Sequence, residues 1–419
     1  MIDAEVTFVH QQLTAPLQLS TGSIEQLTEA RAQVTIRLGG HEAVGRSSMY
    51  LSDLWAWPDA RLTHEHRDAS LRQLCQDIAE HLPELCGRQP AHPLQLGLHL
   101  HGSLYDRGAV ADERPILARA MCASPFDAAL HDAAGQVLDV SAFDFYAFDT
   151  PIPTADLHFT DGACPAIRQI LCSQPLSSLP AWRIVSATGD LQTQVISPIH
   201  SHGYHCFKLK LMGADPHADA KRTSEVFRAA LDTGTSPIRL TVDTNEANPD
   251  AESVLEYLQQ LQRLDANAFD ALQYLEQPTH RDILNHRFDW SKAAQLKPIL
   301  LDEGLTSLDL LDEACAQGWS GMALKTCKGH SVALVVAAWA NRRGCLLSLQ
   351  DLTNPGYALI HAALFAAHVP TINGAELNSP QFTPAANAPW LPRLAQLFEP
   401  AEGEHRLPLQ IPPGLGSTL

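Results

Sequence analysis

FKLKLMG, at residues 207–213, begins a series of short apolar segments that each end in a charged group. The series continues with LTVDTN (240–245), LQYLEQP (272–278), PILLDEG (298–304) and GMALKT (321–326). In a barrel of parallel strands, the carboxyl ends of all the strands meet at one mouth. If these segments are such strands, their lysines and acids gather around one point, which could hold a metal ion.

The sequence pattern around these segments predicts alternating strands and helices. The distance from one charged segment to the next is close to the size of one strand–helix unit. Val254, Leu258 and Leu261 share one face of a predicted helix between two such strands. Further strands are predicted at RIVSA (183–187), LLSLQ (346–350) and PTINGAEL (370–377). The total of about eight is enough to close an α/β barrel.

The first third of the chain has a different pattern. Residues 7–48 alternate as strands do, with turns at Thr21–Gly22 and Gly39–Gly40, and predict an antiparallel sheet. Residues 71–85 and 119–138 carry apolar side chains at helical spacing, whereas His99 and His101 alternate with leucines as in a strand. Residues 149–155 lack periodicity and hold two prolines. We therefore predict an α+β domain at 1–150, completed by the proline-rich tail 382–419, and a barrel domain at 151–381.

Composition limits the class of partner. The chain has 419 residues, 45% of them hydrophobic, and a formal net charge of -18. An acidic protein without a basic stripe is a poor partner for nucleic acid or for an anionic membrane, so we expect a small-molecule ligand. The nine cysteines form no CxxC pair, which favours reduced thiols. The first residues do not resemble a secretion signal, and no segment is long and apolar enough to span a bilayer, so we expect a cytoplasmic protein.

Three acids from three neighbouring predicted strands form a ligand set made only of oxygen. We predict that Asp243, Glu276 and Asp302 bind a metal ion. A hard ion such as Mg²⁺, with Mn²⁺ as an alternative, suits this set better than zinc does. A single aspartate at a strand end is often a helix cap, but three of them interleaved with lysines favour a metal site.

Lysines flank these acids. Alternation along a strand places Lys208 and Lys210 on one face, and Asn245 on the face of Asp243. Lys325 comes from the opposite side. Near a divalent cation and a second ammonium group, a lysine loses its proton more easily and becomes a usable base. The metal would stabilise the enediolate that forms when a proton α to a carboxylate is removed, with one lysine on each face.

At these residues the chain resembles the enolase superfamily, and within it the muconate lactonizing enzyme subgroup. The matching motifs are KLK (208–210), DTN (243–245), EQP (276–278), DEG (302–304) and LKTCKG (324–329), in the order of the family. SPFDAALHDAAGQVL (124–138) is similar to the family's helix that leads into the barrel. The resemblance implies a (β/α)7β TIM-like barrel with an N-terminal α+β capping domain, and commonly a homo-oligomer.

The same resemblance implies roles for particular residues. Lys210 and Lys325 would be the acid/base pair, and Lys208 would tune Lys210. Loops near Thr21 and at residues 50–57 would close over the substrate.

The reaction is open among several outcomes that share this first step. Racemisation or epimerisation of an acid or an N-acylated amino acid is the outcome that we favour. Cycloisomerisation of an unsaturated diacid and syn-elimination of water, as in the o-succinylbenzoate synthase branch, are alternatives. Dipeptide epimerases of the subgroup carry DxD on the last strand, whereas this chain has Glu376-Leu377-Asn378. A non-catalytic barrel that binds a metal or an acid is the rival from another class.

Further residues are candidates for contact with the substrate. We predict Asn245, Thr21, Lys328, Asp351 and Glu376 at the substrate, although Lys328 could equally be a surface lysine and Asp351 a loop cap. Glu303 points away from the ligand face by strand alternation, which predicts a supporting role. His200, His202 and His205 are expected in a solvated loop, with Gly203 ending the preceding helix, and residues 159–180 are expected to be a surface insertion.

Overall fold

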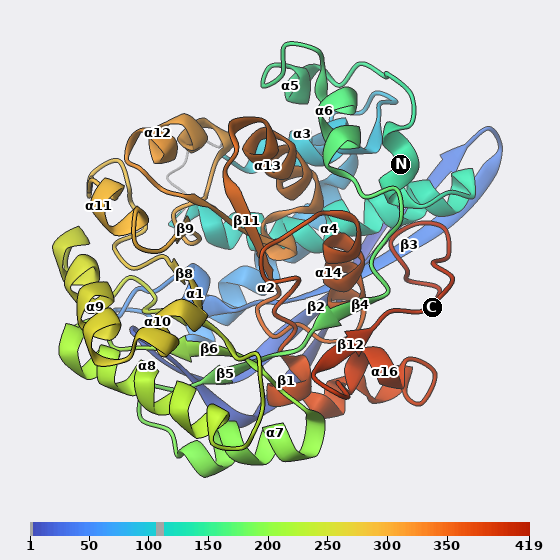
Figure 1. Ribbon diagram of the computed structural model, residues 1–419. Coiled ribbons are helices and arrows are strands. Elements are labelled where there is room, and N and C mark those ends of the chain that lie inside the picture. Colours follow the sequence, from blue (N-terminus) through green and yellow to red (C-terminus); the bar gives the residue numbers. More distant parts are fainter. Residues whose placement is uncertain (1–2, 106–112) are drawn as a thin grey trace.

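An antiparallel sheet opens the part of the chain that the computed structural model describes, residues 3–105 and 113–419 (Figure 1). Its strands are β1 (Asp3–Leu19), β2 (Gly22–Leu38) and β3 (His41–Tyr50), in the order β1-β2-β3. The second turn contains Gly39 and Gly40 at φ 57° and 87°, a conformation that glycine adopts at little cost. The predicted antiparallel sheet and its two turns are therefore confirmed.

Helices cover one face of this sheet. They are α1 (Asp53–Ala56), α2 (His64–Leu85), α3 (Pro93–Tyr105) and α4 (Ile116–Leu138). Helix α4 packs against β3 so closely that a Cβ atom on Gly45 would lie 2.0 Å from the carbonyl oxygen of Ala129. The strand expected around His99 and His101 is wrong, because Leu94, Leu98 and His101 recur at helical spacing and bury one face of α3.

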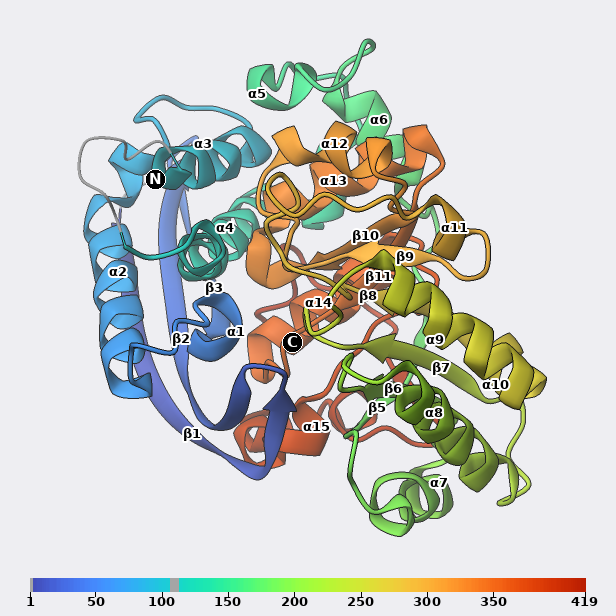
Figure 2. The ribbon, with the colours of Figure 1, turned by 90° about the vertical axis from the view of Figure 1, so that its left-hand side faces the viewer.

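A curled parallel sheet forms the second body of the molecule, beside the first sheet (Figure 2). The strands lie in chain order: β5 (Trp182–Val185), β6 (Cys206–Lys210), β7 (Arg239–Asp243), β8 (Leu272–Glu276), β9 (Ile299–Leu301), β10 (Gly321–Lys325) and β11 (Leu346–Gln350). The connecting helices are α7 (Ser197–His202), α8 (Pro216–Leu231), α9 (Ala251–Leu264), α10 (Ala266–Ala271), α11 (Ser291–Ala294), α12 (Leu311–Ala316), α13 (His330–Arg343) and α14 (Gly356–His368). The predicted barrel-type fold with an α+β cap is confirmed.

The eighth position of the barrel is occupied, but not by a regular strand. Residues 370–377 pair with β11 through one isolated bridge, Gln350 to Glu376. Two backbone bonds join this segment to β11, from Ile372 N to Leu347 O at 2.8 Å and from Glu376 N to Leu349 O at 3.0 Å. Between them, the side-chain amide of Asn373 accepts from Leu349 N at 3.1 Å and donates to Leu349 O at 3.0 Å. On the other side, Trp182 Nε1 of β5 donates to Asn373 O at 2.7 Å. Asn373 therefore closes the ring where the predicted strand does not form.

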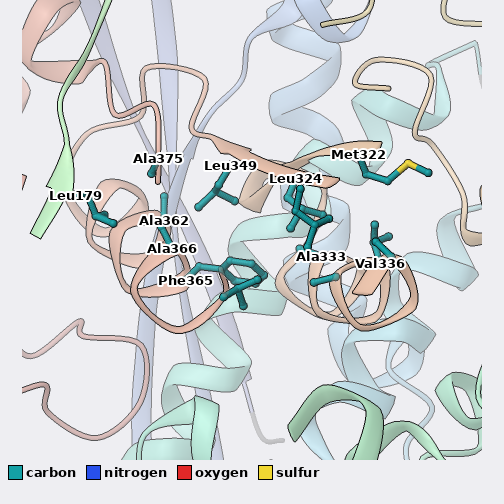
Figure 3. Packing of buried hydrophobic residues seen from close by; sticks show 14 of the residues in the cluster. Leu179, Met322, Leu324, Ala333, Val336, Leu349, Ala362, Phe365, Ala366 and Ala375 are labelled. Carbon is teal, nitrogen blue, oxygen red and sulfur yellow. The ribbon is translucent and has the colours of Figure 1, made fainter. Parts of the chain in front are cut away.

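The core of the barrel is a contact between strands and buried helices. Leu324 of β10 and Leu349 of β11 lie above Ala333 of α13 and Phe365 of α14 (Figure 3). Both helices are buried along almost their whole length. Such helices contribute mainly through apolar burial, and they fix the ends of β10 and β11 in place.

The last part of the chain returns to the first domain, as predicted. Leu415 N donates to Asp132 Oδ1 at 2.8 Å, and Gly414 N donates to Val140 O at 2.9 Å. The strand β12 (Glu404–Arg406) pairs with β4 (Ser178–Pro180). These contacts agree with a tail that completes the first domain, while the proposed domain limits stay a prediction.

The remaining elements are short. Helices α5 (Pro153–Asp156) and α6 (Ala163–Ile170) precede β4, and α15 (Ser379–Phe382) and α16 (Ala395–Phe398) lie in the tail. The 3₁₀ helices are η1 (Ala142–Tyr146), η3 (Leu308–Leu310), η4 (Thr326–Lys328) and η5 (Pro384–Trp390), and η2 (Gln192–Ile196) is a π-helical turn. Gly203, at φ 74°, ends α7 as predicted. Across residues 3–105 and 113–419, no helix combines the length and apolarity that crossing a membrane requires.

Candidate functional site

Most of the predicted site residues line one pocket between the mouth of the barrel and the first sheet. The barrel contributes Ile184, Lys208, Lys210, Asp243, Asn245, Asp302, Lys325, Gln350, Asp351, Leu352, Thr353, Glu376 and Asn378. The first domain contributes Leu17, Leu19, Ile24, Leu27, Ser52 and Trp55. The pocket is thus polar at the strand ends and apolar toward the hairpin of β1 and β2.

Five adjacent strands present the charged groups in a symmetric order. The three central strands end in acids: Asp243 is the last residue of β7, Glu276 is the last of β8, and Asp302 directly follows β9. The two outer strands end in lysines, Lys210 on β6 and Lys325 on β10. Their arrangement agrees with the predicted convergence at one mouth.

Lys208 lies at the centre of the carboxylates. Its Nζ is 2.6 Å from Glu276 Oε2, 2.9 Å from Glu376 Oε2 and 3.3 Å from Asp243 Oδ2. Burial lowers the pKa of Lys208, but these three carboxylates outweigh burial and hold the pKa well above its usual value. Lys208 is therefore a fixed positive charge that joins the acids of β7 and β8 to residue 376.

Lys210 occupies the flank formed by β6. Its Nζ donates to Asp243 Oδ2 at 2.6 Å and to Asn245 Oδ1 at 2.9 Å. Asn245 N also donates to Asp243 Oδ1 at 2.7 Å. Lys210, Asp243 and Asn245 face the same pocket, as strand alternation predicts.

Lys325 occupies the opposite flank. Its Nζ is 3.0 Å from Asp302 Oδ2 and 3.4 Å from Glu276 Oε1, and it also donates to Gln350 Oε1. The ring of Trp55 lies over this ammonium group at 5.6 Å. Burial lowers the pKa of Lys325, yet Asp302 and Glu276 raise it further, so the net pKa lies above its usual value. This is the reverse of the expected lowering, because carboxylates contact the ammonium group directly.

Two predicted substrate contacts lie elsewhere. Lys328 is buried and donates to Asp302 O at 2.6 Å and to Asp302 Oδ1 at 2.9 Å, so it supports Asp302 from behind the pocket. Thr21 is exposed in the turn between β1 and β2, and its neighbours Leu19 and Ile24 line the pocket instead. Asp351 and Glu376 lie in the pocket wall, and their contact with the substrate stays a prediction.

Glu303 does not point away from the site. Its Oε1 accepts from Trp55 Nε1 at 2.9 Å and from Asn245 Nδ2 at 3.1 Å. Strand alternation fails here because β9 ends at Leu301 and the chain turns directly afterwards. Glu303 thus ties the first domain to the barrel beside Asp302.

Two glutamines at the site were not predicted from the sequence. Gln277 Oε1 accepts from Asp302 N at 2.9 Å and from Gly304 N at 3.0 Å, so it positions the turn that carries Asp302. Gln350 bridges Lys325 and Glu276 through its side-chain amide. The position of Gln277 directly after Glu276 was a usable signal, whereas Gln350 ends β11 without any distinctive motif.

The charge balance of the site leaves room for a cation. Six carboxylates (Asp243, Glu276, Asp302, Glu303, Asp351 and Glu376) accompany four lysines (Lys208, Lys210, Lys325 and Lys328), with a formal excess of two negative charges. Burial raises the pKa of Glu276 to about 8, against the opposing effect of Lys208. Glu303 Oε2 is buried and accepts no hydrogen bond from the described residues, whereas Asp302 Oδ2 is paired with Lys325 at 3.0 Å. An oxygen-only set with a formal excess of negative charge fits a hard divalent cation.

The carboxylates are not arranged around an open centre. Within residues 3–105 and 113–419, no three His, Cys, Asp or Glu side chains stand ready to hold a metal ion. Lys208 lies between Asp243 and Glu276, and Lys325 lies between Glu276 and Asp302. Metal binding here therefore requires these ammonium groups to give up part of their contacts.

Comparison with known proteins gives the family. Residues 190–419 match the family described as enolase C-terminal domain-like, which covers more than half of the chain. The chain belongs to this family, and the predicted membership of the enolase superfamily is confirmed. The protein is therefore an enzyme of the enolase superfamily.

Solved structures of the same architecture agree. The N-succinyl Arg/Lys racemase of Bacillus cereus ATCC 14579 has a TM-score of 0.66 at 16% identity, over 99% of this chain and 95% of that one. A muconate lactonizing enzyme from Klebsiella pneumoniae has a TM-score of 0.64 at 19% identity, over 99% and 95%. A dipeptide epimerase from Enterococcus faecalis V583 has a TM-score of 0.64 at 15% identity, over 99% and 98%. At these identities the likeness concerns the fold, and no curated protein matches this chain.

Proposed function

We propose that this protein is a divalent-metal-dependent enzyme that removes and returns the proton α to a carboxylate, most simply as a racemase or epimerase. Asp243, Glu276 and Asp302 would hold the metal ion. Lys210 and Lys325 would exchange the proton. The observation that carries the proposal is the order of the strands: three acids on β7, β8 and β9 lie between lysines on β6 and β10.

A bound Mg²⁺ or Mn²⁺ would supply positive charge for the carboxylate of the substrate and for the enediolate that forms from it. The dipeptide epimerase from Enterococcus faecalis named above was solved with Mg. Other residues of this chain hold the predicted metal ligands in position. Lys208 holds Glu276 and Glu376 in place, and Gln277 fixes the backbone of Asp302.

The two flanking lysines suit proton exchange on opposite faces of a planar intermediate. Lys210 Nζ and Lys325 Nζ each contact a predicted metal ligand, Asp243 at 2.6 Å and Asp302 at 3.0 Å. A change of charge on those carboxylates therefore alters the proton affinity of both lysines directly. Removal by one lysine and return by the other would invert the α-carbon.

The first domain would exclude water from this chemistry. Trp55 lies over Lys325, and its indole nitrogen is fixed by Glu303. Leu19 and Ile24 form an apolar wall on the same side. A dry pocket strengthens every charge interaction within it.

Exchange of the α-proton in deuterated water tests the proposal. With MgCl₂ and a panel of single enantiomers, Lys210→Met and Lys325→Met should each abolish exchange from only one enantiomer. Lys292→Met is the matched control, because Lys292 is exposed and pairs with Glu252 on the surface. Unchanged exchange in both site variants would contradict the assignment, and absence of exchange with every acid despite metal binding would favour a non-catalytic barrel.

A further inference from the structure

The loop that follows β11 is held in an unusual conformation. Leu352 and Thr353 have φ angles of 58° and 63°, in the left-handed region that branched residues rarely adopt. The loop is held on both sides: Thr353 N donates to Asp351 Oδ1 at 2.8 Å, and Tyr50 N of the first domain donates to Asn354 Oδ1 at 2.7 Å. Conformations of this kind persist where the surroundings enforce them, often at binding sites.

This loop places two incompletely used polar groups in the pocket wall. Asp351 is 1% exposed, and within the described residues its carboxylate accepts from two backbone nitrogens, those of Thr353 and Asn378. Thr353 is 3% exposed, and its Oγ1 has no hydrogen-bond partner within the described part of the chain. Both residues line the pocket. A buried hydroxyl without a partner is uncommon in a native protein, and a ligand could satisfy it.

Asp351 differs from its acidic neighbours in the pocket. Asp243, Asp302 and Glu376 each contact a lysine at 3.0 Å or less. For Asp351, no lysine or arginine among residues 3–105 and 113–419 forms an ion pair. Burial raises the pKa of Asp351 to about 8, because no ion pair with a described residue offsets the cost of burying its charge.

Among the described residues that line the pocket, every lysine is already paired with a carboxylate. These lysines, Lys208, Lys210 and Lys325, contact carboxylates at 2.6 to 3.0 Å. The wall toward the first domain is apolar, formed by Leu17, Leu19, Ile24 and Leu27. A second carboxylate on a substrate would therefore lie against Asp351 or against leucine side chains. A substrate with a hydrogen-bond donor beside an apolar side chain would instead place the donor at Asp351 and the apolar group against the leucines.

We propose that Asp351 and Thr353 form a specificity subsite for a nitrogen-bearing donor, an amide N–H or an ammonium group, on an acid with an apolar side chain. The inference rests on the proposed function and narrows its substrates to amino acids or N-acylated amino acids. The same subsite disfavours unsaturated diacids, the substrates of the alternative cycloisomerisation, because Asp351 offers a second carboxylate no positive charge.

Four ligands with one isobutyl side chain test this subsite on the unmodified protein in the presence of MgCl₂. They are N-acetylleucine, its N-methylated derivative, leucine and isobutylmalonate, and titration calorimetry gives their dissociation constants. N-acetylleucine or leucine should bind about tenfold more tightly than the N-methylated derivative and the diacid, the effect of one hydrogen bond to a buried acceptor. Equal affinities, or the tightest binding by the diacid, would overturn the proposal.

Variants separate the two donor sources and exclude a merely structural effect. Thr353→Val should remove the difference between N-acetylleucine and its N-methylated derivative, while Thr353→Ser, which keeps the hydroxyl, should retain it. Asp351→Asn should weaken leucine more than N-acetylleucine if the donor is an ammonium group, and both alike if it is an amide. A parallel loss for all four ligands in Thr353→Val would overturn the role of Thr353.

The outcome also separates this inference from the proposed function. If the N–H preference is found but no ligand exchanges its α-proton in deuterated water, the subsite is supported and the proposed reaction fails. If exchange occurs and the four affinities are equal, the reaction is supported and the subsite fails. The series with the unmodified protein decides the question even if a variant does not fold.

Discussion

Two buried charged clusters in this molecule are built in opposite ways. At the mouth of the barrel, carboxylates face buried lysine ammonium groups, and Glu303 Oε2 accepts no hydrogen bond from the described residues. At the junction of the domains, the single carboxylate of Asp127 on α4 is surrounded by fixed donors. It accepts from Ser331 N at 2.9 Å and Ser331 Oγ at 2.7 Å, and it lies 3.3 Å from His101 Nε2 and 3.2 Å from His131 Nδ1.

The difference shows what each cluster is for. Burial raises the pKa of Asp127, but the hydrogen bonds from His101 and His131 outweigh burial and keep that pKa well below its usual value. At the mouth, burial wins for Glu276 and raises its pKa. A fully satisfied charge fixes structure, whereas an undersatisfied one can change partner or protonation state. Asp127 also anchors the start of α13, directly after Lys325 and Lys328.

The largest effect on stability is expected at the junction. Asp127→Ala leaves several buried donors without an acceptor and should lower the free energy of unfolding by about 3–5 kcal/mol. Urea unfolding measures this. Asp161→Ala, which removes an exposed partner of Arg342, is the control and should change stability by less than about 1 kcal/mol. If the two variants lose the same stability, the distinction between the clusters fails.

The mouth should respond in the opposite sense. Glu276→Gln puts a neutral group of the same shape in place of the carboxylate. Because burial already raises the pKa of Glu276, the free energy of unfolding at pH 7 should not fall. Affinity for Mg²⁺ should nevertheless fall by about tenfold or more, because one charged oxygen ligand is lost. Calorimetric titration with MgCl₂, alongside urea unfolding of the metal-free protein, measures both. A variant that is destabilised yet binds metal normally would reverse the assignment.

The two regions should also show opposite pH slopes. His361, next to His330, is buried, and burial lowers its pKa to about 3. As the pH falls below about 6.5, His361 becomes protonated in the unfolded chain but stays neutral in the folded one. The free energy of unfolding of the wild type should therefore fall by ~1.4 kcal/mol per pH unit relative to that of His361→Gln.

For Glu276 the sign is reversed, because its folded pKa is raised. The contribution of Glu276 to the free energy of unfolding is present below about pH 4.3 and is lost as the pH rises toward 8. Between these pH values Glu276→Gln should therefore become more stable relative to the wild type. Unfolding curves of the metal-free proteins at a series of pH values give both differences. Slopes of the same sign would show that the clusters do not differ as described.

The smallest effect concerns the link between the domains. Trp55→Phe removes the donor to Glu303 and should cost about 1 kcal/mol of stability. A double-mutant cycle with Glu303→Gln isolates the contact, and a coupling free energy near zero would show that the hydrogen bond contributes nothing.

The sequence was most informative where a residue ends a regular strand. Lys210, Asp243, Glu276 and Lys325 could be predicted because each is the last residue of its strand, and Asp302 follows one directly. Alternation and strand order then fix their direction. The barrel-type fold followed from the same pattern.

What the sequence did not reveal depends on irregular backbone. Glu303 turns toward Trp55 only because β9 stops at Leu301, and Asn373 replaces a strand by imitating backbone hydrogen bonds with its side chain. Thr353 faces the pocket through a left-handed conformation that no periodicity predicts. The raised pKa of Lys325 follows from distances to carboxylates, and these distances are not encoded in spacing.

One contact of the first domain has a consequence for synthesis on the ribosome. Asp132, on α4, is bound by the backbone of Leu415, which lies 283 positions later in the chain. Translation proceeds at roughly 5–20 residues per second, so α4 would wait well over ten seconds for this partner. During that interval Arg46 N and Gln136 Nε2 can already donate to Asp132 Oδ2, but Oδ1 lacks its partner from the C-terminal tail. A chaperone that shields this part of the nascent helix would raise the yield of active protein.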